Sequence, residues 1–147
     1  MMTFIDSNVF IIDLRYHRDK NFRANREFLE EIRRKRDGVT GLVNLLEVCG
    51  VMSFSLNADQ LFELFVHFPR HYSVEVLPYA SLEGKFPEVS LKRIFEHISR
   101  KISFGDALVF SSIEEHMPGV NKIVTWDKAH FEGKTKLKVL TPREYLP

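Results

Sequence analysis

The sequence has few of the residues that build disulfide frameworks, zinc sites or membrane anchors. Its single cysteine, Cys49, excludes an internal disulfide and lies in an apolar run, which indicates a buried thiol in a reducing compartment. The few histidines lack the spacing of a zinc site. Asp6 and Asp13 interrupt the apolar N-terminal stretch, and no basic flank or cleavage signal accompanies it. This pattern predicts neither a signal peptide nor a membrane span, so we expect a cytoplasmic protein.

A strong excess of one charge is also missing, since 21 Lys and Arg balance 20 Asp and Glu to a formal net charge of +1. The signs are nevertheless segregated. Residues 1–36 and 122–143 are rich in bases, whereas residues 37–84 contain Arg70 as their only Lys or Arg. Segregation of this kind allows a basic face beside an acidic pocket, as in a protein that guides a polyanion. Charge counts alone favour ordinary solvated helix faces.

The length and the apolar content predict one compact domain over residues 1–147. A chain of 147 residues with 44% hydrophobic content can bury a real core, and it contains no internal repeat or low-complexity segment. The residue patterns predict short strands at residues 3–6, 72–78, 122–126 and 137–140. They predict helices that begin after Asp6 and at residues 21–36, 41–52, 58–68, 88–101 and 106–116. Alternating strands and helices indicate an α/β fold with a mainly parallel sheet.

Several of these boundaries depend on single residues. Gly38 is interpreted as the stop of the second helix, and Pro69 as the end of the helix that starts near Ala58. The helix over residues 58–68 is apolar nearly all round, which predicts burial within the domain or against a partner. In the helix over residues 88–101 we expect five apolar side chains to point inward: Val89, Leu91, Ile94, Phe95 and Ile98.

Four acids occupy apolar or small-residue contexts. Asp6 and Asp127 follow predicted strands, where parallel sheets form ligand crevices, Asp106 begins a helix, and Glu47 lies within one. A buried carboxylate is costly unless it is neutralised, paired or bound to a metal. Oxygen ligands of this type suit Mg²⁺ or Mn²⁺ better than zinc.

Each acid also has a possible structural role. Asp6 can cap the following helix, Asp106 can complete a capping box with Ser103, and Asp127 can begin a turn. For these three acids the sequence supports a structural role and a functional role about equally. Asn44 is the only polar neighbour of Glu47 on a helix that is otherwise apolar. This favours a buried functional carboxylate at Glu47.

Four short motifs carry a resemblance to a known family. They are I-D-S-N-V at residues 5–9, N-L-L-E-V at 44–48, F-G-D-A-L-V at 104–109 and T-W-D-K-A-H-F at 125–131. In this order the motifs resemble the PIN-domain nucleases, and most closely their VapC-like toxin branch. The resemblance implies a PIN-like three-layer α/β/α sandwich. It also implies catalytic and metal-binding roles for Asp6, Glu47, Asp106 and Asp127, with Ser7, Asn8 and Thr125 as supporting polar residues.

The same resemblance implies an activity and partners. The expected activity is hydrolysis of RNA phosphodiester bonds with Mg²⁺ or Mn²⁺ as cofactor, and the expected partners are a second copy of the chain and a cognate antitoxin. A PIN nuclease of RNA processing without an antitoxin, or a non-catalytic PIN-fold scaffold, would carry the same motifs. Phosphotransfer and receiver domains fit less well, because the haloacid-type pattern needs an Asp at the position of Asn8.

Basic and aromatic residues near the motifs allow two interpretations. The bases after the first motif can follow a phosphate backbone or form a solvated helix face, and the two are about equal. These bases are Arg15, Arg18, Lys20, Arg23, Arg26 and the run at residues 33–36. Trp126 and Phe131 can stack on RNA bases, but a core position is favoured.

Overall fold

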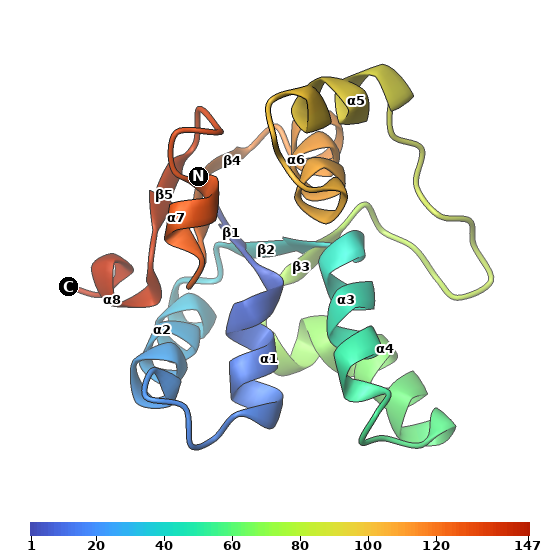
Figure 1. Ribbon diagram of the computed structural model, residues 1–147. Coiled ribbons are helices and arrows are strands. Elements are labelled where there is room, and N and C mark those ends of the chain that lie inside the picture. The colour runs from blue at the N-terminus through green and yellow to red at the C-terminus, as the bar shows by residue number, and fades with distance from the viewer.

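The computed structural model describes all residues from Met1 to Pro147 and builds them around one sheet. The five strands are β1 (Met2–Ile5), β2 (Gly38–Gly41), β3 (Glu75–Leu77), β4 (Val120–Val124) and β5 (Lys138–Leu140). They lie in the order β3-β2-β1-β4-β5, and every neighbouring pair is parallel. The predicted α/β fold with a mainly parallel sheet is therefore confirmed (Figure 1).

Eight helices cover the two faces of this sheet. Their bounds are α1 (Ser7–Arg15), α2 (Phe22–Lys35), α3 (Leu42–Met52), α4 (Ala58–Tyr72), α5 (Leu91–Ser99), α6 (Phe104–His116), α7 (Lys128–Phe131) and α8 (Pro142–Tyr145). Helices α1 to α4 and α8 pack on one face, and α5 to α7 pack on the other. The result is a three-layer α/β/α sandwich (Figure 1).

Alternating side chains of the central strands pack into two separate hydrophobic cores. Ile5 and Val124 point into the larger cluster with α1 to α4, whereas Phe4 and Ile123 point into the cluster under α6. This alternation follows from the two-residue period of a strand. In the larger cluster the rings of Phe10 and Phe68 pack edge to face at 4.7 Å. The prediction that Cys49 is buried is confirmed.

Two element boundaries differ from the sequence-based expectation. Gly38 does not simply end a helix but begins β2, where an added Cβ would come within 2.6 Å of the Ile32 side chain. The helix expected to stop before Pro69 continues to Tyr72. Proline removes only one N–H near the end of α4, and burial of Phe68 and Tyr72 against Phe10 holds the last turn in place. The short helices α7 and α8 were not predicted.

The orientation of α5 also corrects the expectation. Leu91 is 80% exposed and Phe95 67%, and Ile98 is exposed as well. The side chains that face α6 are Arg93, which pairs with Glu114 and Glu115, and His97, which pairs with Glu114. Of the five apolar side chains expected to point inward, Ile94 packs against the α6 core and Val89, before α5, is half-buried, whereas Leu91, Phe95 and Ile98 face outward. Helix α5 therefore contacts the domain through Ile94 and the polar side chains of Arg93 and His97.

None of the eight helices has the length and apolar character needed to cross a lipid bilayer.

Candidate active site

The candidate site lies where the direction of strand connections reverses. From β1 the chain proceeds to β2 and β3 on one side, whereas β4 and β5 follow on the other side. Asp6 directly follows β1, and Thr125 directly follows the adjacent β4. Crevices at the carboxyl ends of strands at such a switch point are the usual ligand sites of open parallel sheets. We call the residues described below at this edge the acid site.

Asp6 is the most buried member of the acid site, with 9% exposure. One carboxylate oxygen accepts a hydrogen bond from the Ser7 N–H at 2.8 Å, and the other accepts from Thr125 Oγ1 at 2.8 Å. Asp6 is also the N-cap of α1, so the predicted capping role is confirmed. The cap uses only part of its hydrogen-bonding capacity, and the role does not exclude a second one.

Burial changes the acidity of Asp6. The pKa of its carboxyl is raised from 3.8 to about 7, mainly because burial desolvates the charged form, with a smaller contribution from the negative charges of Glu47 and Asp106. The hydrogen bonds from Thr125 and Ser7 oppose this rise. A carboxylate that is held near two others and shielded from water attracts a cation.

Glu47 is placed differently from the expectation. It is exposed rather than buried, because α3 turns Leu45, Val48 and Cys49 toward the core and leaves Glu47 on the outer side. Its Oε1 still accepts a hydrogen bond of 2.9 Å from Ser7 Oγ. Desolvation raises the pKa of Glu47, and the nearby charge of Asp106 adds to this shift. Glu47 therefore borders the acid site with access to solvent.

Asp106 and Asp127 approach the site from the other layer. Half-buried Asp106 lies in the first turn of α6, where its backbone N–H donates to Ser103 Oγ at 3.3 Å. Its side chain makes no reciprocal capping bond, so only half of the expected capping box forms. Exposed Asp127 accepts a 3.3 Å hydrogen bond from Asn8 Nδ2 and leaves α7 without a side-chain cap. Neither carboxylate therefore caps a helix N-terminus through its side chain.

The predicted supporting residues join Asp6, Glu47 and Asp127 into one hydrogen-bonded network, and no hydrogen bond connects the Asp106 carboxylate to it. Asn8 Nδ2 donates to Thr125 Oγ1 at 3.1 Å, and it also contacts Asp6 Oδ2 at 3.4 Å. Thr125 Oγ1 accepts from the backbone N–H of Asp127 at 3.0 Å. Ser7 connects Asp6 to Glu47 through its N–H and hydroxyl. Residues more than 100 positions apart are thus held together.

Asn44 is a member that the sequence reasoning missed. It is buried, and its Nδ2 donates to Ser7 Oγ at 2.8 Å and to Asp6 Oδ1 at 3.3 Å. It lies about one helical turn before Glu47, so both side chains project toward Ser7. The signal in the sequence is a lone amide on an apolar helix.

A second buried asparagine anchors the loop after β4. Asn25 accepts a 2.8 Å hydrogen bond from Trp126 Nε1 and donates one to the Val9 carbonyl at 2.8 Å. Phe131 is buried and packs against Phe110 at 5.2 Å. The favoured core positions of Trp126 and Phe131 agree with these contacts.

The oxygen donors of the acid site are of the type that binds a hard cation. Its acids, however, do not converge to form a complete set of metal ligands. All donors are oxygen atoms of carboxylates and hydroxyls, the ligands that Mg²⁺ and Mn²⁺ prefer. No three of the His, Cys, Asp and Glu side chains form a group that could hold a metal ion. Mg²⁺ commonly binds one or two carboxylates and keeps several waters, so the arrangement suits a partly hydrated ion.

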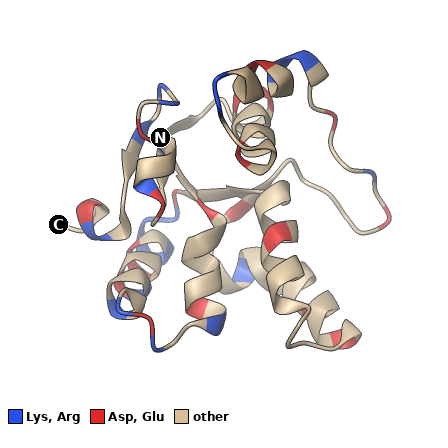
Figure 2. Ribbon diagram, in the orientation of Figure 1, with Lys and Arg blue, Asp and Glu red and all other residues tan.

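The basic residues after the first motif are exposed, and part of them lies away from the acid site. Residues 33–36 end α2 and lead into the start of β2. In a parallel sheet this start lies at the edge opposite the acid site. Figure 2 shows many of the Lys and Arg positions along α2 and its flanking turns. Arg34 and Lys35 also pair with Glu31, so the solvated-face interpretation gains weight for this run.

Comparison with known proteins supports the fold and adds no family assignment. No protein-family model and no curated sequence matches the chain. Among solved structures the chain is similar to a chain in the structure of FitAB bound to the IR36 DNA fragment. The TM-score is 0.61 at 12% sequence identity over 99% of both chains. A similarity at this identity shows the fold alone, and it confirms the predicted PIN-like α/β/α architecture.

Proposed function

We propose that the chain is a divalent-cation-dependent endoribonuclease that acts as the toxin of a VapBC-type pair. The observation that carries this proposal is the buried Asp6 carboxylate at the switch point, in the electrostatic field of Glu47 and Asp106. The PIN-like fold supports it, because the resemblance of the four motifs implies the same architecture. A PIN nuclease of RNA processing without an antitoxin remains the alternative.

In this proposal some side chains bind the ion and others hold the binding side chains in orientation. Asp6 and Asp106 would hold the cation, and Glu47 and Asp127 would add negative charge beside it. A bound Mg²⁺ or Mn²⁺ would supply positive charge to the phosphate oxygens and lower the pKa of a bound water. Ser7 keeps the Glu47 carboxylate in place, and Asn8 and Thr125 fix the orientation of Asp6 and Asp127.

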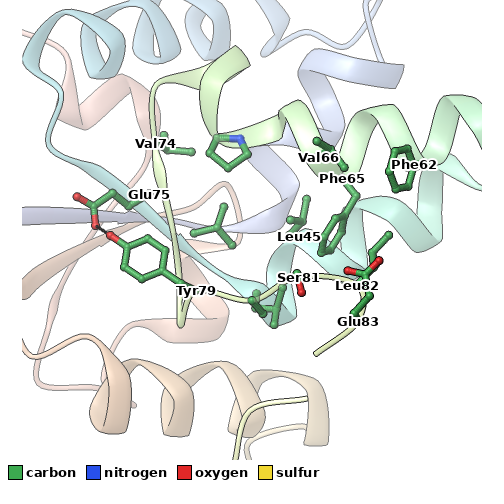
Figure 3. Close-up of a pocket in the computed structure, with 14 residues that line it drawn as sticks. Leu45, Phe62, Phe65, Val66, Val74, Glu75, Tyr79, Ser81, Leu82 and Glu83 are labelled. Carbon is green, nitrogen blue, oxygen red and sulfur yellow. Dashed lines mark hydrogen bonds between the residues drawn. The ribbon is translucent and has the colours of Figure 1, made fainter. Parts of the chain in front are cut away.

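Two apolar surfaces supply sites for the proposed protein partners. A groove of about 440 Å³ lies between α4 and the segment after β3, with Phe62, Phe65 and Leu82 among its lining residues (Figure 3). Phe62 and Leu82 are exposed, so this groove can receive an apolar segment of an antitoxin. The outward stripe of α5, with Leu91 and Phe95, is available to a second copy of the chain.

RNA cleavage in Mg²⁺ or Mn²⁺ tests the activity. We expect the native chain to cut single-stranded RNA, and Asp6→Asn and Asp106→Asn to lose at least about 100-fold in rate, since each removes a charge from the ion site. Asp59→Asn, an exposed acid on α4, is the matched control and should cut normally. A DNA substrate belongs in the same assay, because the similar FitAB structure contains DNA. Equal rates in all four proteins would refute the proposal.

A further inference from the structure

A buried asparagine on α2 connects the two strand ends that form the acid site. The side chain of Asn25 is 0% exposed and lies between α1 and the loop after β4. Its Nδ2 donates to the Val9 carbonyl, and its Oδ1 accepts from Trp126 Nε1, both at 2.8 Å. Asn25 makes no hydrogen bond to a carboxylate of the acid site, so any effect it has on that site passes through its two partners.

The two partners of Asn25 require opposite hydrogen-bonding groups. The Val9 carbonyl only accepts hydrogen bonds, and the indole N–H of Trp126 only donates. An asparagine amide supplies one donor end and one acceptor end, so a single orientation satisfies both partners. Aspartate would turn a carboxylate toward the carbonyl, and leucine would bond to neither partner. Since an unpaired polar group is costly to bury, the amide is specific to this position.

Trp126 is fixed both at its backbone and at its ring. Its backbone N–H donates to Asn8 Oδ1 at 3.2 Å, and its indole N–H donates to Asn25. Its two neighbours in the chain, Thr125 and Asp127, both belong to the acid site. Because one residue cannot shift without moving its neighbours, displacement of Trp126 would move both of them.

The other end of the connection lies beside Asp6. Val9 belongs to the first turn of α1, whose N-cap is Asp6. Thr125 Oγ1 bonds to the Asp6 carboxylate at 2.8 Å, so the two strand ends also contact each other directly. The hydrogen bonds of Asn25 fix the loop after β4 to α1 on the core side of this contact. We call Asn25 and Trp126 the Asn25–Trp126 pair.

We propose that the Asn25–Trp126 pair positions the acid site. The pair fixes the loop after β4 to the first turn of α1 and thereby holds Thr125 and Asp127 in place relative to Asp6. Neither residue supplies a charge or a metal ligand. The consequence for metal binding rests on the proposed function, whereas the order of the loop does not.

Three variants and one matched control test this role in the full-length chain. Trp126→Phe keeps an aromatic ring and removes the indole N–H, Asn25→Leu removes the amide, and the third variant combines both changes. The control is Tyr72→Phe, which removes a different aromatic donor, the hydroxyl that bonds to Asp13 at 2.8 Å away from the acid site. All measurements are made at a temperature at which each protein is fully folded.

Calorimetric titration with Mn²⁺ is the first measurement. We expect each single variant to bind Mn²⁺ about three- to tenfold more weakly, less than the roughly 10- to 100-fold loss typical when a direct partner of a metal ligand is removed. The double variant should bind no more weakly than the weaker single variant, because both residues act through one hydrogen bond. Tyr72→Phe should bind as the native chain does.

Hydrogen exchange in EDTA is the second measurement and needs no metal. The backbone N–H of Asp127 donates to Thr125 Oγ1 at 3.0 Å, so its exchange reports the order of the loop. In the three variants we expect exchange at residues 125–127 to speed up more than exchange in β1. An equal change in both segments would show a loss of global stability alone and would overturn the positioning role.

The titration can also overturn the proposal. Native Mn²⁺ affinity in Trp126→Phe and Asn25→Leu would do so, as would an equal loss of affinity in Tyr72→Phe. Losses that multiply in the double variant would show that the two residues act independently rather than as a pair. If the native chain binds no Mn²⁺, the proposed function fails, and the exchange measurement alone then decides whether the pair orders the loop.

Discussion

At the scale of single residues, Asp6 combines a structural and a proposed chemical role. It caps α1 through the Ser7 N–H, and it still presents a carboxylate whose pKa is raised to about 7. A capping aspartate normally stays exposed and ionised, because the helix terminus favours its charge. Burial of Asp6 beside two other acids therefore costs stability that a cap alone does not require.

This cost predicts how Asp6→Asn changes stability in the absence of metal. The folded chain binds the Asp6 proton more tightly than the unfolded chain, so the stabilisation from protonated Asp6 is full below pH 3.8 and is lost as the pH rises to about 7. Asparagine is neutral throughout, so the variant should melt at a higher temperature than the native chain at pH 8. The difference should shrink toward pH 4.

Thermal melts in EDTA between pH 4 and pH 8 measure this effect. Each pKa unit corresponds to about 1.4 kcal/mol, and each kcal/mol to about 2–4 °C in a chain of this size. Asp59→Asn, which changes an exposed acid on α4, serves as the control. Parallel melting curves for Asp6→Asn and the native chain would contradict the account of Asp6.

Asn44 predicts a second residue-scale result. Asn44→Ala removes the donor that holds Ser7 Oγ and Asp6 Oδ1, and the acids themselves remain. Loss of such an orienting partner typically lowers activity or metal affinity by about 10- to 100-fold. We expect the rate of RNA cleavage to fall within this range, with partial rescue by a higher Mn²⁺ concentration. The exposed Asn121→Ala is the control, and an unchanged rate in Asn44→Ala would exclude the orienting role.

Sequence reasoning found part of the acid site and missed the rest for identifiable reasons. Asp6, Ser7, Asn8 and Thr125 directly follow two strands, and adjacency of these strands is enough to bring them together. The burial of Glu47 was predicted wrongly, because apolar neighbours in sequence do not reveal which side of α3 faces the core. Asn44 was missed because its importance depends on a contact 37 residues away.

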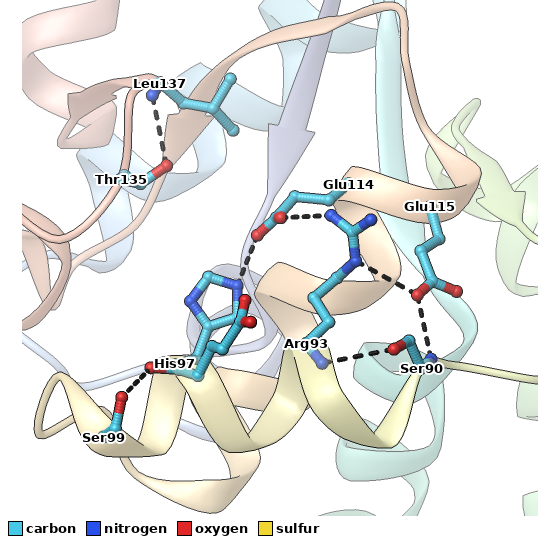
Figure 4. Close-up of polar contacts among 9 residues, drawn as sticks. Ser90, Arg93, His97, Ser99, Glu114, Glu115, Thr135 and Leu137 are labelled. Carbon is cyan, nitrogen blue, oxygen red and sulfur yellow. Dashed lines mark hydrogen bonds and ion pairs between the residues drawn. The ribbon is translucent and has the colours of Figure 1, made fainter.

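At the scale of elements, the errors cluster where local pattern and tertiary context disagree. Strand β2 is four residues long with a glycine at each end, so its composition resembles a turn. It forms because it pairs with β1 and β3, and the Thr40 hydroxyl donates to the Ile5 carbonyl at 2.7 Å. Helix α5 has a clear amphipathic pattern, but the pattern does not say that Arg93 and His97 face α6 (Figure 4) while Leu91 and Phe95 face solvent.

The orientation of α5 predicts which of its side chains contribute to stability. Phe95→Ser should change the free energy of unfolding by less than about 0.5 kcal/mol at low protein concentration, because the ring is exposed. Ile94→Ala, the control from the inward side, should cost more than about 1 kcal/mol because Ile94 packs against the α6 core. Urea denaturation measures both. A larger loss for Phe95→Ser than for Ile94→Ala would show that α5 is oriented the other way.

At the scale of the whole molecule, the parallel sheet separates two kinds of surface chemistry. The carboxyl edge gathers acids from α3, α6 and the ends of β1 and β4, and at the amino edge Arg100, Lys134 and Lys136 line a cavity beside α5 and α6. The fold class and the strand-end acids could be predicted from sequence periodicity. The cavity at the amino edge could not, because α5, α6 and the segment before β5 meet there only in the folded chain.

The central claim is that the acids of the carboxyl edge act as one divalent-cation site, and calorimetric titration of the metal-free chain with Mn²⁺ at pH 8 tests it most directly. We predict saturable binding by the native chain and by Asp59→Asn, and binding at least about tenfold weaker in Asp6→Asn and in Asp106→Asn, since each removes one proposed ligand. Equal Mn²⁺ affinity in the native chain and both acid-site variants, or no binding by the native chain, would contradict the account.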